Sequence, residues 1–91
     1  MSTDNQELND LILDLINLSF SVNQLNVLKA IAKSYSLAVE DIAAKVNKSH
    51  QNTSSVLMAL KKKGVVNCVN RGRFHYYSIN NSQLRKILLS V

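Results

Sequence analysis

Short polar side chains gather between residues 49 and 55, in a pattern that suits recognition of nucleic-acid bases. Gln and Asn can each form two hydrogen bonds with an adenine edge, and a Ser hydroxyl can bond to a base or a phosphate. The candidate base-contacting residues are Ser49, His50, Gln51, Asn52, Ser54 and Ser55. An ordinary solvated helix face is the alternative interpretation of any isolated polar stripe. Because this stripe lies in the most basic part of the chain, the nucleic-acid interpretation is favoured.

The charge of the chain is unevenly distributed along its length. Residues 1–41 carry six acids and two bases, and residues 42–91 carry nine bases and no acid, so that the formal charges are −4 and +9. A solvated domain without a polyanionic partner usually mixes its signs. The segregation therefore favours a phosphate-lined partner, with compositional drift as the alternative. The candidate contacts to the DNA backbone or minor groove are Lys45, Lys48, Arg71, Arg73 and His75.

The apolar periodicity predicts the elements that position these side chains. Spacings of three and four predict helices over residues 4–19, from Val22 to about Ser34, over Val39–Val46, and from the N-cap Ser49 to Lys63. The period then changes to two, which predicts a hairpin of strands Val65–Val69 and Phe74–Ile79 around a turn that contains Gly72. A last helix begins after the N-cap Asn81, and Leu37 begins a very short strand.

These elements predict one domain over residues 1–91, mainly α with a small β-hairpin, in the order α-α-α-α-β-β-α. Residues 39–63 form the helix-turn-helix and residues 65–79 the wing of a winged helix-turn-helix. The second helix is expected to bury Val22, Leu25, Leu28, Ile31 and Ala32. The three lysines before Gly64 are expected to stabilise the end of a helix, a role favoured over DNA contact.

From Leu25 to Leu88 the chain resembles the ArsR-type winged-helix regulators. The resemblance rests on Leu25, Val27 and Leu28, and on the segments Val39–Ala43, Ser49–Leu60, Gly64–Val66 and Arg71–Ile79. It implies a homodimer built from residues 1–20 and 81–91, with two recognition helices in successive major grooves of double-stranded DNA. The expected interface residues are Leu8, Leu11, Ile12, Leu15, Leu84, Ile87 and Leu88.

The chain departs from this family where many members sense metals. Leu37–Asp41 contains no cysteine pair, and Leu84–Val91 contains no His or acidic ligand. His50 and His75 are far apart in sequence and are expected to lack nearby carboxylates. We therefore expect no metal site, no cofactor and no enzymatic activity. The single cysteine, Cys68, and an N-terminus unlike a signal peptide lead us to expect a cytoplasmic protein without a membrane segment.

The leading functional hypothesis is a sequence-specific, DNA-binding transcriptional regulator, acting as a repressor without metal sensing. The alternative is a TubR-like adaptor that links repeated centromere sites of a plasmid or phage to a filament-forming, tubulin-like GTPase. A winged helix used only for protein contacts is a third possibility, and it does not account for the acid-free half of the chain.

Overall fold

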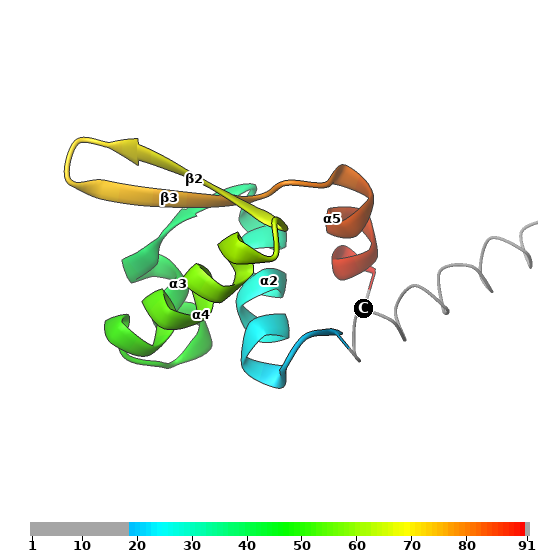
Figure 1. Ribbon diagram of the computed structural model, residues 1–91, viewed down its shortest axis with the longest axis horizontal. Coiled ribbons are helices and arrows are strands. Elements are labelled where there is room, and N and C mark those ends of the chain that lie inside the picture. The colour runs from blue at the N-terminus through cyan, green and yellow to red at the C-terminus, as the bar shows by residue number, and fades with distance from the viewer. Residues whose placement is uncertain (1–18, 91) are drawn as a thin grey trace, which may run out of the picture.

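The computed structural model describes residues 19–90, which fold as a winged helix-turn-helix (Figure 1). The elements are α2 (Val22–Ser34), β1 (Ser36–Ala38), α3 (Val39–Val46), α4 (His50–Lys62), β2 (Val66–Arg71), β3 (Phe74–Ile79) and α5 (Ser82–Leu89). The predicted fold class and element order are confirmed over this part of the chain. The expected first helix, with Leu8, Leu11, Ile12 and Leu15, lies outside the described residues. Within residues 19–90, no helix is long and apolar enough to cross a bilayer.

The N-caps Ser49 and Asn81 are confirmed, and so is Ser21, whose hydroxyl just before the apolar stripe of α2 predicts a third. Ser21 and Gln24 form a reciprocal capping box, in which each side chain accepts a hydrogen bond from the other residue's backbone N–H. The Asn81 side chain accepts from two backbone N–H groups at the start of α5. These contacts satisfy donors that the first turn of a helix leaves unpaired. The helix starts are therefore determined by residues within a few positions of each cap.

Helix α2 is the centre of the core, and it contacts α3, α4, α5 and β3. It buries Val27, Leu28, Ile31 and Ala32. The expectation that Val22 is buried is wrong, because its side chain is 73% exposed. Val22 and Leu28 are six positions apart, and each position turns the helix by about 100°. Their side chains therefore point about 120° apart around the helix axis. The buried stripe passes instead through Val27, which is not among the five residues expected to be buried.

The strands form one antiparallel sheet in the order β1-β3-β2. The predicted short strand at Leu37 is confirmed as β1, which pairs with β3 so that Leu37 faces Tyr77. The hairpin is tighter than expected: pairing continues to Arg71 opposite Phe74 and leaves only Gly72 and Arg73 in the turn. Gly72 has a φ of +62°, a conformation that glycine adopts without steric cost. The tight turn makes the wing a long, two-stranded projection from the helices (Figure 1).

Tyr77 joins the sheet to the core, and its pKa makes stability dependent on pH. Burial raises the pKa of the Tyr77 phenol above its ordinary value, and Cys68, its partner across the hairpin, raises it further. A raised pKa stabilises the fold fully below the unfolded value of about 10, and this contribution is lost as the pH rises through the folded value. We expect the denaturant concentration at the unfolding midpoint to decrease as the pH rises above about 10, and to decrease more steeply for the protein than for its Tyr77→Phe variant. Parallel curves for the two proteins would contradict this expectation.

Candidate nucleic-acid interface

A tight turn connects α3 to α4 and determines where the N-terminus of α4 lies. Asn47 adopts the left-handed conformation at φ 57° and ψ 48°, which Asn tolerates better than most residues. The backbone N–H of Lys48 then donates to the carbonyl of Ala43 at 3.1 Å. The Ser49 side chain accepts from the backbone N–H of Asn52 at 3.1 Å. Ser49 is therefore the N-cap, as predicted, and its oxygen is already used within the protein.

Helix α4 has one face in the core and one in solvent. Thr53, Leu57 and Leu60 are buried, whereas His50, Gln51, Asn52 and Ser55 are exposed and Ser54 is half-buried. The apolar spacing of α4 predicts an inner stripe of Thr53, Val56, Leu57 and Leu60. Three of these residues are buried as expected, whereas Val56 is half-buried. All six candidate base-contacting side chains, Ser49 included, are at least partly accessible at the start of the helix, where a recognition helix contacts bases. Their contact with DNA remains a prediction.

Met58 joins the same exposed face, and the sequence analysis did not single it out. Gln51, Ser55 and Met58 follow one another at intervals of four and three residues, so they align along α4. The Met58 side chain is 54% exposed. An apolar side chain on such a face can contact the methyl group of thymine. The sequence could have predicted this exposure, because Met58 lies beside the buried stripe of Leu57 and Leu60 and not within it.

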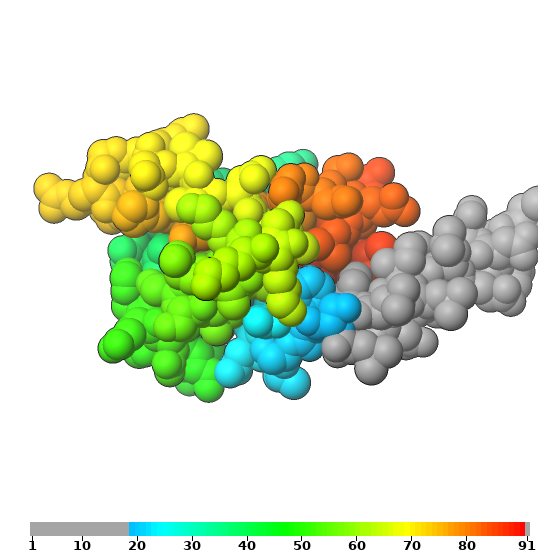
Figure 2. Space-filling view, viewed as in Figure 1, coloured from blue at the N-terminus to red at the C-terminus, as the bar shows by residue number. Residues whose placement is uncertain are grey.

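The wing carries its charge at the tip. Arg71 ends β2 and Arg73 lies in the turn, and both are exposed. Figure 2 shows the hairpin (yellow) projecting over the helix-turn-helix (green), with its tip free of the helices. Arginine at such a tip can reach phosphates or enter a narrow minor groove. The structure thus brings the two predicted arginines together at the end of the wing.

A groove of about 340 Å³ separates α4 from the wing. His50, Ser54 and Met58 line it from α4, and Asn70 and His75 line it from the hairpin. The two histidines, which are 25 positions apart in the sequence, therefore border the same groove. This juxtaposition joins the candidate base-contacting face to the candidate backbone-contacting wing.

The expectation that both histidines lack nearby carboxylates is wrong for His50. The Nε2 atom of His50 lies 3.5 Å from Oε1 of Glu40, because α3 and α4 pack against each other. His75 instead pairs with Asn70 across the hairpin, with 2.5 Å between Nδ1 and Oδ1. Within residues 19–90 no three His, Cys, Asp or Glu side chains are grouped closely enough to hold a metal ion.

The predicted backbone contacts fall into two groups. Arg71, Arg73 and His75 belong to the wing, whereas Lys45 and Lys48 lie at the other side of α4, beside α2. Lys45 shares an open groove with Lys29 and Lys33, which the sequence analysis treated only as counter-charges to the acidic residues. Residues 19–90 carry all eleven Lys and Arg residues and two of the six acids. A polyanion could therefore meet positive charge on both sides of α4.

The lysine run at the end of α4 contains residues with different surroundings. The ammonium of Lys63 donates to the carbonyl oxygen of Ser19 at 2.5 Å and lies 4.8 Å from the centre of the Phe20 ring. These contacts give Lys63 a structural role, but they join α4 to the segment before α2 and do not test the expected stabilisation of the helix end. Gly64 follows with a φ of +77° and ends the helix. Lys61, in contrast, lines the groove beneath the wing.

No protein-family model and no curated protein matches the sequence, but solved structures match the fold. The AntR antimony-specific transcriptional repressor is 25% identical, with a TM-score of 0.71 over 87% of this chain and 71% of that one. The homodimeric winged helix-turn-helix DNA-binding domain of a possible ArsR-family regulator from Mycobacterium bovis is 25% identical, with a TM-score of 0.70 over 92% and 77%. A MarR family regulator from Silicibacter pomeroyi is 14% identical, with a TM-score of 0.71 over 98% and 67%, a likeness of fold alone.

Proposed function

We propose that this chain, an ArsR-type winged helix-turn-helix protein, binds double-stranded DNA as a homodimer and represses transcription. One observation carries the proposal: His50 and Ser54 at the start of α4 border the same groove as Asn70 and His75 of the wing, whose tip carries Arg71 and Arg73. The major groove of B-DNA is about 12 Å wide and accepts one helix. In the proposed complex, α4 enters that groove and the wing contacts the backbone or the adjacent minor groove. Titration of the protein with double-stranded DNA at low salt tests this directly, and failure to form a complex would refute it.

The proposed dimer uses residues 1–20 and 81–91. Within the protomer Ile87 and Leu88 are already buried and Leu84 is half-buried, while Leu89 is 44% exposed. The homodimeric neighbour from Mycobacterium bovis supports a dimer of this kind. Two-fold symmetry would present two α4 helices to half-sites about 34 Å apart, one turn of DNA. The proposed cellular location remains the cytoplasm.

Repression is the proposed outcome because a dimer on a promoter excludes other proteins from it. A footprint on the DNA upstream of the gene should then protect one palindromic site. A series of direct repeats, bound cooperatively, would instead indicate the TubR-like segregation adaptor and its tubulin-like GTPase partner. Both functions would use the same contacts between protein and DNA. Only the arrangement of the binding sites along the DNA therefore distinguishes a repressor from a segregation adaptor.

Base recognition by α4 predicts a loss of specificity when its amide side chains are removed. Gln51→Ala and Asn52→Ala should each weaken binding to the preferred duplex by about 1–3 kcal/mol if the lost contact is bidentate. Binding to random duplex DNA should change little, because non-specific binding depends on phosphate contacts. The preferred duplex is obtained by selection from a random pool, and both affinities are measured by fluorescence anisotropy.

Asn67→Ala provides the matched control for these variants. Asn67 is an exposed amide near the start of β2, and it lies outside the predicted DNA contacts, the proposed dimer segments and the groove between α4 and the wing. This variant should leave both affinities unchanged. Equal losses on preferred and random DNA for Gln51→Ala and Asn52→Ala would show that α4 does not recognise bases through these residues.

A further inference from the structure

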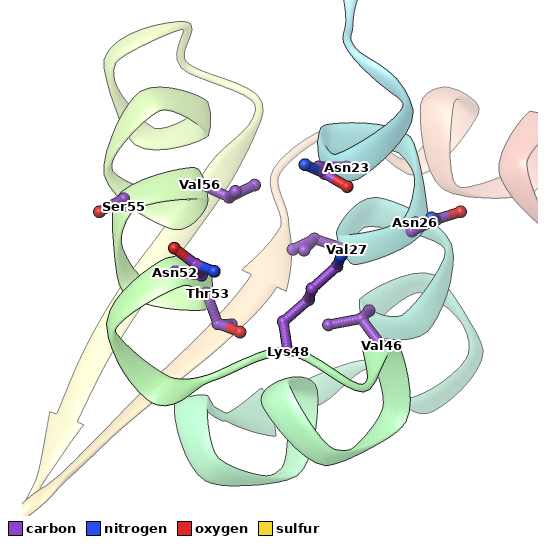
Figure 3. A pocket seen from close by; sticks show the side chains of 9 residues that line it. All are labelled: Asn23, Asn26, Val27, Val46, Lys48, Asn52, Thr53, Ser55 and Val56. Atoms are coloured by element: carbon purple, nitrogen blue, oxygen red, sulfur yellow. The ribbon is translucent and has the colours of Figure 1, made fainter.

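A second pocket, of about 210 Å³, lies between α2 and α4 on the side away from the wing (Figure 3). Asn23 and Asn26 line it from α2, Asn52 and Thr53 line it from α4, and Lys48 lines it from the turn. Figure 3 shows the Lys48 side chain extending from the turn across the space between the two helices. The pocket thus combines a flexible cation with amide and hydroxyl groups that belong to fixed helices.

The hydroxyl of Thr53 is the unusual feature of this pocket. Thr53 is 1% exposed, and its Oγ1 atom has no hydrogen-bond partner. In Figure 3 its side chain descends from α4 towards the turn and Lys48. A buried hydroxyl without a partner costs folding free energy, since the group has lost its water without gaining a bond. A bound molecule with a hydrogen-bonding group could supply the missing partner.

The lining determines the chemistry of that molecule. Lys48 is the only charged residue of the nine that line the pocket, so the site favours an anion. Asparagine amides and the Thr53 hydroxyl can donate hydrogen bonds to its oxygens. Val27, Val46 and Val56 supply apolar surface beside these groups. A molecule that satisfies both kinds of surface has a carboxylate at one end and a small apolar body.

The volume limits the size of that body. An apolar cavity of about 150 Å³ accommodates benzene, and the pocket of about 210 Å³ is larger by roughly the room that a carboxylate needs. We propose that this pocket binds a small organic carboxylate of about the size of benzoate, and that the bound ligand weakens binding to DNA. The second half of this proposal rests on the proposed function, whereas the first half does not.

The link to DNA binding follows from shared residues. Lys48 is a predicted phosphate contact, and Asn52 and Ser55 are predicted base contacts, yet all three line the pocket. A ligand that pairs with Lys48 removes a positive charge from the DNA-facing surface and restrains the side chain beside it. Because such coupling is reciprocal, DNA should weaken ligand binding by the same factor.

The ligand half is tested by NMR titration of the full chain with three probes. Benzoate supplies charge and body, benzamide supplies the same body without the charge, and acetate supplies the charge without the body. We expect saturable shifts at residues 48 and 53, with benzoate binding at least about tenfold more tightly than either control, the value of one lost interaction of about 1.4 kcal/mol. No saturable shift with benzoate, or equal affinity for acetate, would overturn the proposal.

Four variants identify the site. Thr53→Val replaces the hydroxyl with a methyl group, and Lys48→Gln removes the charge; each should weaken benzoate binding by about tenfold, while Thr53→Ser should weaken it less. Val56→Phe, at a half-buried position, should abolish the benzoate shifts by filling the pocket, and so tests the site by a second route. Unchanged affinity in Thr53→Val and Val56→Phe would show that benzoate pairs only with surface lysines.

The regulatory half is tested by DNA titration with and without saturating benzoate. The dissociation constant for DNA should rise by about tenfold, as expected for a typical coupling free energy, and the rise should vanish in Val56→Phe. If benzoate binds but DNA affinity is unchanged, the regulatory half is wrong. If the protein binds no DNA at all while the NMR shifts persist, the proposed function fails and the ligand site stands.

Discussion

Leu57→Ala should lower the free energy of unfolding by about 3 kcal/mol, whereas Met58→Ala, one position further along α4, should change it by less than about 0.5 kcal/mol. The Leu57 side chain has no exposed surface and belongs to the core cluster that joins α2, α3 and the sheet. Removing it takes away buried apolar surface and leaves a cavity, and close-packed surroundings relax only in part. Met58 points into solvent, so that its truncation creates no cavity.

Chemical denaturation at fixed protein concentration measures this difference. The midpoint should fall for Leu57→Ala with an unchanged slope, and the melting temperature should fall by roughly 15 °C for a chain of this size. Fixed concentration is required because association of the protomers would add to the apparent stability. If Met58→Ala were as destabilising as Leu57→Ala, the orientation of α4 in the structure would be wrong, and with it the exposed face proposed to contact DNA.

The orientation of α4 could be predicted because it depends on residues within one helix. The N-cap Ser49 and the inner stripe of Thr53, Val56, Leu57 and Leu60 are local patterns. The cap and three of the four stripe residues are confirmed, and Val56 is half-buried. The error at Val22 arose where the pattern is weakest, at the first residue of a helix with apolar side chains on several sides. Local patterns therefore predict which face of a helix is buried, provided that the stripe is long enough to define it.

The groove and the pocket could not be predicted, because they depend on how separate elements pack. His50 lies beside Glu40 through the packing of α3 on α4, and it borders the same groove as His75 because the wing lies beside α4. The sequence predicts that Thr53 faces inward, but whether its hydroxyl finds a partner depends on Asn23 and Lys48, on other segments. Juxtapositions of this kind arise from tertiary contacts, and helical or strand periodicity contains no information about them.

The wing should provide the largest single electrostatic contribution to DNA binding. For each protomer, the double variant Arg71→Ala/Arg73→Ala should reduce the salt slope of binding by about two and weaken binding roughly 50-fold at 0.1 M salt, since each phosphate contact adds about 0.9 to the slope. Both arginines are exposed at the end of a rigid hairpin, and the variant retains Gly72, whose φ of +62° maintains the turn. Stability should therefore change little.

Lys62→Glu lowers the net charge by the same two units at another site, and so distinguishes a local contact from an effect of net charge. Lys62 is exposed in the last turn of α4, away from the N-terminal end of α4 that is proposed to enter the major groove. If the wing contacts DNA, this control should leave the salt slope nearly unchanged, because only phosphates in direct contact release counterions. Equal reductions in slope for Lys62→Glu and the double arginine variant would mean that DNA responds only to the overall positive charge, and the wing would then have no specific role in the complex. A reduction confined to Arg71→Ala/Arg73→Ala, with an equal loss on preferred and random duplexes, would assign the wing to the DNA backbone and leave base recognition to α4.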